Sequence, residues 1–203
     1  PAANGLVPDA LTIDGMNYRD TVGEITPAAV DARALYMAAR QELTTSDFSK
    51  VSLMVPAGSS MTSAAEEING AWQKEFSLFF SVEEVDEETF NTRLASGDYT
   101  IALAPVSAEG GSVYNMLTQF TATGGSLTGY ANSLYATRLQ ASTQTTGASR
   151  CRLLADCERQ LLDDAVVVPL FAQQKRLLIA NGIQNLIFDP FGPVLDLTYT
   201  TKE

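Results

Sequence analysis

The chain has 203 residues, of which 45% are hydrophobic and 18% are charged, so it can bury a sizeable core as one domain, or as one large domain with extensions. Its formal net charge of −11 argues against a nucleic-acid surface, because phosphate binding requires a surplus of lysine and arginine. Its apolar runs are shorter than the roughly 20 residues that a membrane-spanning helix needs, so no such helix is predicted.

The N-terminal half alternates between strands and helices. Residues 1–24 are rich in Pro, Gly, Asn and Asp and predict an irregular lead-in. Thr26 and Pro27 predict the start of a helix, in which Val30, Leu35 and Leu43 are among the apolar residues. A strand is expected over residues 50–56, and Ser59 or Ser60 is expected to cap the helix that follows.

The same alternation continues to residue 106. A second strand is expected over residues 77–85, then a short helix that is capped by Asp86 and ends at Gly97, and then a third strand over residues 99–106. This order is typical of parallel crossovers in an α/β layer.

The C-terminal half begins with a loop-rich region, in which short helices are expected over residues 113–120 and 132–142. A longer helix follows, and one of its faces carries Leu154, Cys157, Leu161 and Leu162. Residues 165–170 form a β-branched run that contains Pro169, which predicts a strand covered on both faces. Further strands are expected over residues 175–180 and 195–200, with a turn at Asn181-Gly182.

The cysteine and histidine content bears on catalysis. Cys151 and Cys157 lie about 9 Å apart along one helix and on different faces, so we interpret them as small buried hydrophobes that do not pair with each other. The chain has no histidine, which excludes a histidine-based triad or zinc site within it. It also lacks the glycine-rich nucleotide motifs and the nucleophile elbow, and we interpret its neighbouring acidic residues as solvated or capping groups. We therefore expect no enzyme, no metal site and no cofactor.

Several segments, in order, resemble the extracellular solute-binding proteins of the oligopeptide- and dipeptide-binding family, which deliver peptides to ABC importers. The passage from helix to strand at residues 161–170 is similar to the family's Leu-Leu-Asp-Asp junction, and Gly129-Tyr130-Ala131-Asn132 is similar to its Gly-Tyr-x-Asn. The first residues, PAANGLVP, resemble the stretch in which such proteins cross from the first lobe into the second. A longer passage of helices and strands matches the family at Ile68, Trp72, Lys74, Phe90, Arg93, Gly97, Asp98 and Tyr99.

This resemblance implies a fold class: an α/β lobe of the type II periplasmic-binding-protein-like fold, with a mixed sheet flanked by helices. It implies that residues 1–25 are an interlobe lead-in, that residues 26–185 are the C-terminal lobe, and that residues 186–203 return toward an N-terminal lobe that lies outside this sequence. Apolar residues in the range 183–191 are then expected to be more exposed than in the parent protein.

The resemblance also implies a ligand site. In the family, a carboxylate that follows the third strand pairs with the amino terminus of some bound peptides. The best-matching position here is Glu109, although Glu-Gly-Gly-Ser departs from the family's Asp and proline-containing loop. Tyr114 and Tyr130 are further candidates for lining the cleft.

The function implied is non-covalent capture of a solute, most directly a peptide, for an ABC importer. The implied partners are the solute, the N-terminal lobe and the permease subunits, and the implied location is extracellular or periplasmic, as a cell-surface lipoprotein in the full-length form. Two alternatives stay open. One is capture of another solute, such as a nickel complex, a sugar or a signalling peptide, and the other is a surface sensor or interaction module that kept the fold.

Overall fold

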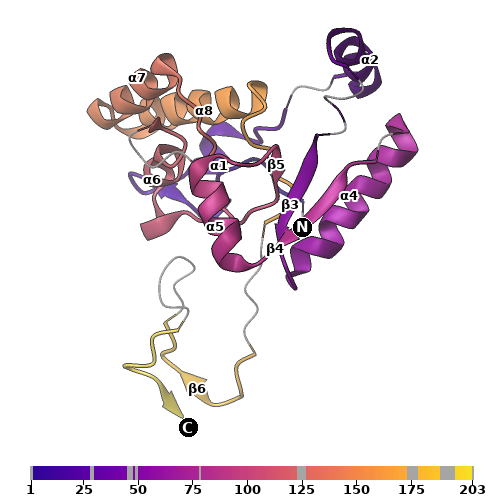
Figure 1. Ribbon diagram of the computed structural model, residues 1–203. Coiled ribbons are helices and arrows are strands. Elements are labelled where there is room, and N and C mark those ends of the chain that lie inside the picture. The colour runs from indigo at the N-terminus through magenta and orange to yellow at the C-terminus, as the bar shows by residue number, and fades with distance from the viewer. Residues whose placement is uncertain are drawn as a thin grey trace. The chain divides into compact units, whose positions relative to one another are not determined.

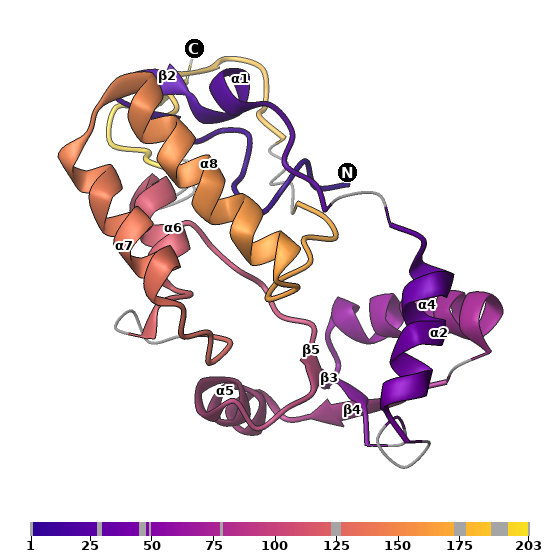
Figure 2. The same ribbon diagram turned by 90° about the horizontal axis from the view of Figure 1, so that it is seen from above.

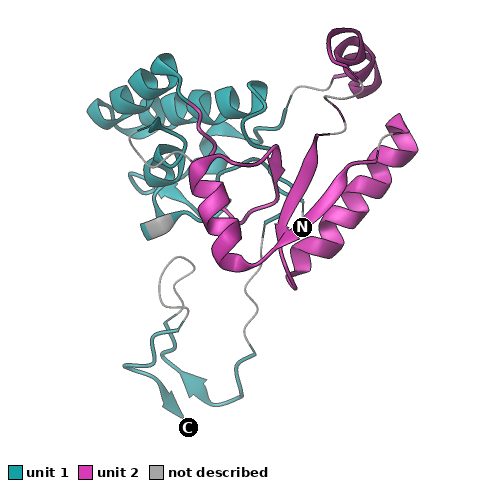
Figure 3. Cartoon of the chain, in the orientation of Figure 1, with its two compact units in different colours: residues 1–27, 107–124, 131–203 teal, residues 28–106, 125–130 magenta. Residues whose placement is uncertain are grey.

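The computed structural model describes residues 2–27, 30–44, 48, 50–77, 79–122, 127–172, 178–187 and 195–202. The chain divides into two compact units (Figure 3). Unit 1 combines Pro1–Pro27, Ser107–Gly124 and Ala131–Glu203, and unit 2 combines Ala28–Val106 and Gly125–Tyr130. The predicted boundaries after residues 25 and 185 concern the path between lobes of a longer protein, and they stay a prediction.

Unit 2 is built on a parallel three-stranded sheet in the order β4-β3-β5. Strand β3 (Ser52–Pro56) lies in the middle and pairs with β4 (Ser81–Val85) and with β5 (Ile101–Ala102). Leu53, Met54 and Val55 are all buried, as expected of a central strand that is covered on both faces. The predicted α/β layer is therefore confirmed, although β4 and β5 are shorter than expected.

Two helices cover opposite sides of this sheet (Figures 1 and 2). Helix α4 (Ser60–Phe76) is capped by Ser59, as predicted, and its buried Ala65 packs with Leu53 and Val55. Helix α5 (Glu87–Ser96) is capped by the Asp86 side chain and ends at Gly97 in the left-handed conformation, which confirms both predicted signals. The apolar spacing and the caps thus place these crossover helices correctly.

Helix α2 (Ala32–Glu42) begins later than predicted. Its cap is Asp31, whose side chain accepts from the Ala34 amide at 2.9 Å, and Thr26 and Pro27 lie outside the helix. The predicted apolar face is also wrong, because Leu35 is 58% exposed. The helix instead turns Tyr36 toward Phe76 of α4, with the ring centroids 5.3 Å apart.

The N-terminal part of unit 1 is more regular than predicted. Strands β1 (Thr12–Ile13) and β2 (Met16–Asn17) form an antiparallel hairpin, and α1 (Tyr18–Val22) follows directly. Asp14 and Gly15 make the hairpin turn with φ angles of 51° and 79°. The expected irregular lead-in is thus wrong for residues 12–22. The buried residues of the range 2–27 are Gly5, Leu6, Val7, Leu11, Ile13, Tyr18, Arg19 and Ile25.

Three helices form the rest of the unit 1 core. Helices α7 (Ser133–Ala141) and α8 (Gly147–Asp163) pack along each other, and α6 (Val113–Thr118) contacts both (Figures 1 and 2). Tyr135 of α7 joins this layer by donating its hydroxyl to the Leu117 carbonyl at 2.7 Å. The predicted inward face of α8 is confirmed, because Leu154, Cys157, Leu161 and Leu162 are buried.

Two of the predicted C-terminal strands are wrong. Residues 165–170 form no strand: Ala165 has a φ of 52°, and the antiparallel bridge between Ala2 and Phe171 is the pairing found next to this run. Val168 is 60% exposed, so the run is not covered on both faces. Apolar, β-branched sequence favours a strand only where a partner strand is available.

The final expected strand, over residues 195–200, contains instead an isolated bridge between Asp196 and Ile187 and a turn. The last pairing joins β6 (Ile183–Gln184) to β7 (Thr201–Lys202), and the predicted turn at Asn181-Gly182 precedes it. Ile187 is 48% exposed. Residues 178–180 of the predicted strand over residues 175–180 form no strand, whereas residues 175–177 and residues 188–191 lie outside the described residues.

Candidate functional site

The segment that begins at residue 107 carries two of the three predicted ligand residues. The Glu109 backbone lies in a single 3-10 turn, η1 (Glu109–Gly111), and the Glu109 side chain lies outside what the structure describes. Gly110 and Gly111 both have positive φ, 63° and 65°, which explains the two glycines. Ser112 then caps α6 by accepting from the Asn115 amide at 3.3 Å, so this short sequence turns the chain directly into the helix of Tyr114.

Tyr114 lines a pocket of about 600 Å³ within unit 1. It is an open depression, unlike the enclosed clefts that usually bury small ligands. The walls come from α6, from α7 and from the 3-10 turn η3 (Ser142–Gln144). The lining residues are Tyr114, Thr118, Thr121, Ala136, Thr137, Leu139, Gln140, Ala141 and Gln144.

Tyr130 belongs to the segment Gly125–Tyr130 of unit 2 and is not among the residues that line this pocket. Tyr114 thus lies in a pocket, Glu109 precedes it on the same segment, and Tyr130 is placed in the other unit. The ligand roles of all three residues stay predictions.

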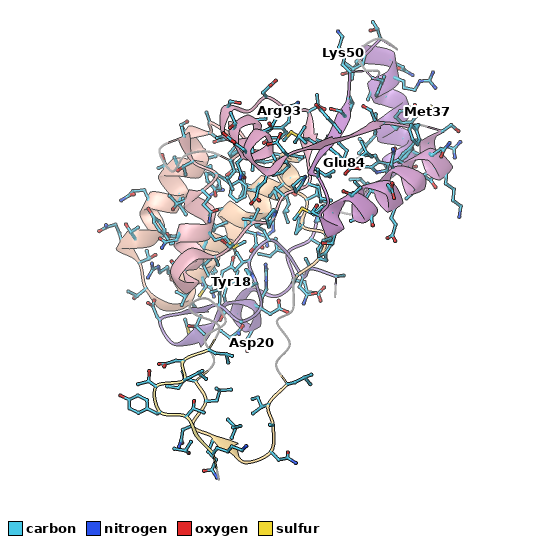
Figure 4. All side chains as sticks on the ribbon, turned by 60° about the horizontal axis from the view of Figure 1, so that its bottom comes forward. Tyr18, Asp20, Met37, Lys50, Glu84 and Arg93 are labelled. Carbon is cyan, nitrogen blue, oxygen red and sulfur yellow. The ribbon has the colours of Figure 1, made fainter. Side chains whose placement is uncertain are left out.

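A buried polar cluster, which the sequence analysis missed, ties the N-terminal segment of unit 1 to α8. Glu158 is fully buried, and its carboxylate pairs with Arg19. It also accepts from the Tyr18 hydroxyl at 2.9 Å and from the Val7 amide at 3.0 Å. Figure 4 labels Tyr18 and, two residues further along α1, the exposed Asp20.

The sequence does carry a signal for this cluster. Glu158 lies on the same helical face as Leu154, Leu161 and Leu162, and a carboxylate on an apolar face requires buried donors. Arg19 supplies one of them and also donates from Nη2 and Nε to the Val7 carbonyl at 2.7 and 3.0 Å. Arg19 and the Val7 amide satisfy the Glu158 carboxylate in the interior of unit 1, so we interpret the cluster as structural.

Burial disfavours the ionised forms of Tyr18 and of both cysteines. It raises the pKa of Tyr18 far above the usual range, and the Glu158 charge raises it further. It also raises the pKa of the Cys157 thiol to about 12. Both cysteines are free and buried, and burial raises the Cys151 pKa as well, so neither thiol presents an activated nucleophile.

Among the described residues, no cluster of three or more acidic or cysteine side chains is placed to hold a metal ion. None of the helices within the described ranges has the length and apolar character needed to cross a membrane.

No protein-family model matches the chain, and no curated protein sequence gives a significant match. Solved structures do match. The pheromone receptor PrgZ, whose mode of peptide binding has been described, superposes with a TM-score of 0.76 and 21% identity over 100% of this chain and 40% of its own. The substrate-binding domain of an oligopeptide ABC transporter from Bacillus anthracis str. Ames gives 0.74 and 15%, with the same two coverages of 100% and 40%.

A third match, a peptide-binding protein of a peptide ABC transporter, has a TM-score of 0.66 and 19% identity over 82% of this chain and 77% of its own. These three proteins are named as binding proteins, receptors or domains rather than as enzymes. The chain spans 40% of the length of PrgZ and of the Bacillus anthracis protein. It therefore shares the α/β fold of the matching part of these three proteins.

Proposed function

We propose that this chain is the C-terminal part of a bilobal protein that captures peptides for an ABC importer. The observation that carries this proposal is the match of the whole chain, at TM-scores of 0.76 and 0.74, to a peptide-binding receptor and to an oligopeptide-transporter binding domain. The resemblance of the sequence to the family at Trp72, Gly97, Asp98 and Tyr99 also supports it.

In this proposal the protein acts by closing two lobes over its cargo and changes no covalent bond. Strand edges and loop amides hold the peptide backbone, while pocket volume and one or two charges select among side chains. The partners are then the peptide, the N-terminal lobe and the permease subunits, and the location is the periplasm or the cell surface, where a lipid anchor would retain the protein.

Calorimetry on the full-length protein tests the function directly. We expect titration with a mixed library of short peptides to give saturable heats, because the two lobes together provide a closed site. A sugar mixture and a nickel complex serve as parallel titrants, since both are cargo alternatives. Saturable binding of the sugars or of the nickel complex, with no heat from peptides, would show that the cargo is not a peptide.

Glu109 provides a test at a single residue. If its carboxylate pairs with the amino terminus of the cargo, Glu109→Gln should lower the affinity for peptides with a free amino terminus by roughly tenfold or more. The reason is that a charge-assisted hydrogen bond is lost. Amino-terminally acetylated peptides should bind the variant and the original protein alike. An equal loss for both kinds of peptide would remove Glu109 from the site.

A further inference from the structure

Three asparagines of the chain are followed directly by glycine, at Asn4-Gly5, Asn69-Gly70 and Asn181-Gly182. An asparagine in this setting can react with its own backbone, because glycine has no Cβ atom to hinder the approach of its amide nitrogen to the side-chain carbonyl carbon. The reaction requires a backbone that can rotate and an amide nitrogen that is not held elsewhere. The three sites differ in both respects.

The fold protects Asn69. Its side chain is buried, donates to the Phe80 carbonyl at 2.6 Å and accepts from the Phe80 amide at 3.0 Å. Gly70 lies inside α4, where the regular hydrogen bonds of a helix hold the backbone amides. The Gly70 nitrogen therefore reaches the Asn69 side chain only if this part of α4 unfolds.

The fold also protects Asn4, although the Asn4 side chain itself is exposed. Gly5 is buried, and it packs so closely against Arg19 and Glu158 that even a Cβ atom has no room there. The Asn4 carbonyl is held as well, because it accepts from the Ile25 amide at 3.0 Å. Rotation of this peptide would disturb the buried ion pair of unit 1.

Asn181 and Gly182 lie in the middle of an exposed turn. One backbone hydrogen bond closes the turn, from the Ile183 amide to the Ala180 carbonyl at 3.3 Å, and it does not involve the Gly182 amide. Gly182 has a φ of 87°, which glycine adopts without strain. Residues 178–182 are all exposed, and the turn directly precedes β6 (Figure 1). The chain here can rotate without opening a packed core.

We propose that Asn181, alone among these three asparagines, is a site of spontaneous deamidation in the folded chain, with water as the co-reactant. The Gly182 nitrogen attacks Cγ of Asn181 and closes a succinimide ring. The proton that this nitrogen loses leaves with the side-chain NH₂ group as ammonia. Water then adds to the ring at Cγ, which gives aspartate, or at the backbone carbonyl carbon, which gives isoaspartate.

The isoaspartate product changes the backbone itself. It directs the main chain through the side-chain methylene of residue 181 and adds a carboxylate to a chain whose formal net charge is already −11. The turn then loses the spacing that its hydrogen bond needs, and β6 begins directly after it and pairs with β7. The modification is thus expected to loosen the β6–β7 pairing as the protein ages, whatever its cargo is.

Peptide mass spectrometry of the 203-residue chain, aged in mildly alkaline buffer under native conditions, tests the proposal. We expect the peptide that contains Asn181 to gain the mass of deamidation at least about tenfold faster than the peptides that contain Asn4 or Asn69, because these two sites must first open locally. A protease that cleaves at aspartate but not at isoaspartate should leave part of the product uncut. In urea, the three sites should react at similar rates.

Asn181→Gln should abolish the modification at the turn, because glutamine has to close a larger ring. Asn91→Gln is the matched control, since it makes the same exchange at an exposed asparagine that no glycine follows, and it should leave the modification of Asn181 unchanged. Circular dichroism before ageing checks that both variants are folded.

Three results would overturn the proposal. One is an Asn181 rate in the native chain that is no higher than that of Asn4 or Asn69. Another is a product that consists of aspartate alone, which would exclude the succinimide. The last is the same ratio of rates in urea as in native buffer, because the local sequence would then set the difference instead of the fold.

Discussion

At the scale of single residues, Glu158 shows how unit 1 holds a charge in its interior. The carboxylate is shielded from water and accepts from Val7, Tyr18 and Arg19, so its desolvation is offset by hydrogen bonds and by a buried cation. Replacing such a pair by apolar residues is often neutral, whereas removing one partner costs about 3–5 kcal/mol, because the other charge stays buried. The cluster thus anchors residues 5–19 to α8.

Gly5 is the residue whose substitution should disturb this cluster most directly. A Cβ atom there would lie 2.3 Å from Arg19 Nη2 and 2.6 Å from Glu158 Oε1, and the φ of Gly5 is +144°. We expect Gly5→Ala to lower the free energy of unfolding by about 3 kcal/mol, since it adds backbone strain and separates a buried pair. Urea denaturation followed by circular dichroism measures the change.

Gly70 provides the control. It lies inside α4, and a Cβ atom built on it meets nothing within 4 Å. Gly70→Ala should therefore raise the stability by about 0.5–1 kcal/mol through helix propensity alone. A denaturation midpoint for Gly5→Ala at or above that of the unsubstituted chain would contradict the assignment of a structural role to the cluster.

At the scale of elements, Asn69 fixes the connection from α4 to β4. Its side chain is buried, donates to the Phe80 carbonyl at 2.6 Å and accepts from the Phe80 amide at 3.0 Å. These two hydrogen bonds resemble one bridge of a β-sheet. They span the left-handed residue Ser77, which ends α4. Trp72, the single tryptophan, packs edge-on against Phe80 with the ring centroids 5.2 Å apart, so it reports on this junction.

We expect Asn69→Ala to cost about 1–3 kcal/mol, because it leaves the partly buried backbone N–H and C=O groups of Phe80 without their partners. Tryptophan emission during urea denaturation measures the loss, and the emission of the folded variant should change as the Trp72 environment loosens. Asn91→Ala on the exposed side of α5 is the matched control and should stay within about 0.5 kcal/mol of the unsubstituted chain. Equal effects of the two substitutions would refute the role of Asn69.

Elements also show where sequence patterns mislead. The apolar run over residues 165–170 reads as a buried strand, yet it lacks a ladder, and Val168 is exposed. By contrast, the shorter run of β3 is paired on both sides and fully buried at its centre. Composition alone does not separate the two, because strand formation depends on a partner that lies elsewhere in the chain.

At the scale of the whole molecule, the chain spans 40% of the length of PrgZ, with which it shares a fold along its entire length. Under the proposed function, the other lobe that closes over the cargo is then contributed by residues outside this sequence. The large exposed apolar side chains of the C-terminal part, among them Leu178, Leu197 and Tyr199, agree with such an arrangement.

We therefore expect the 203-residue chain to bind peptides at least about tenfold more weakly than the full-length protein, because one lobe cannot exclude water from the peptide. Calorimetry with the same peptide on both proteins measures the difference. Equal affinities would show that this chain holds the complete site, which would contradict the bilobal proposal.

The sequence by itself determined the features that depend on near neighbours in the chain. The caps at Ser59 and Asp86, the stop at Gly97 and the inward face of α8 were all predictable, because helix ends and helix faces are set within a few residues. The resemblance likewise predicted the α/β fold that the solved structures share, and it placed Tyr114, Glu109 and Tyr130 as candidates.

Only the tertiary structure decided what depends on distant partners. It joined Glu158 to Arg19 across 139 residues of sequence, and it gathered the uncharged wall around Tyr114 from α6, α7 and η3. It also left residues 165–170 unpaired and placed Tyr130 in a different unit from Tyr114. Burial, pairing and pocket formation are properties of groups that meet in space, so no local pattern can specify them.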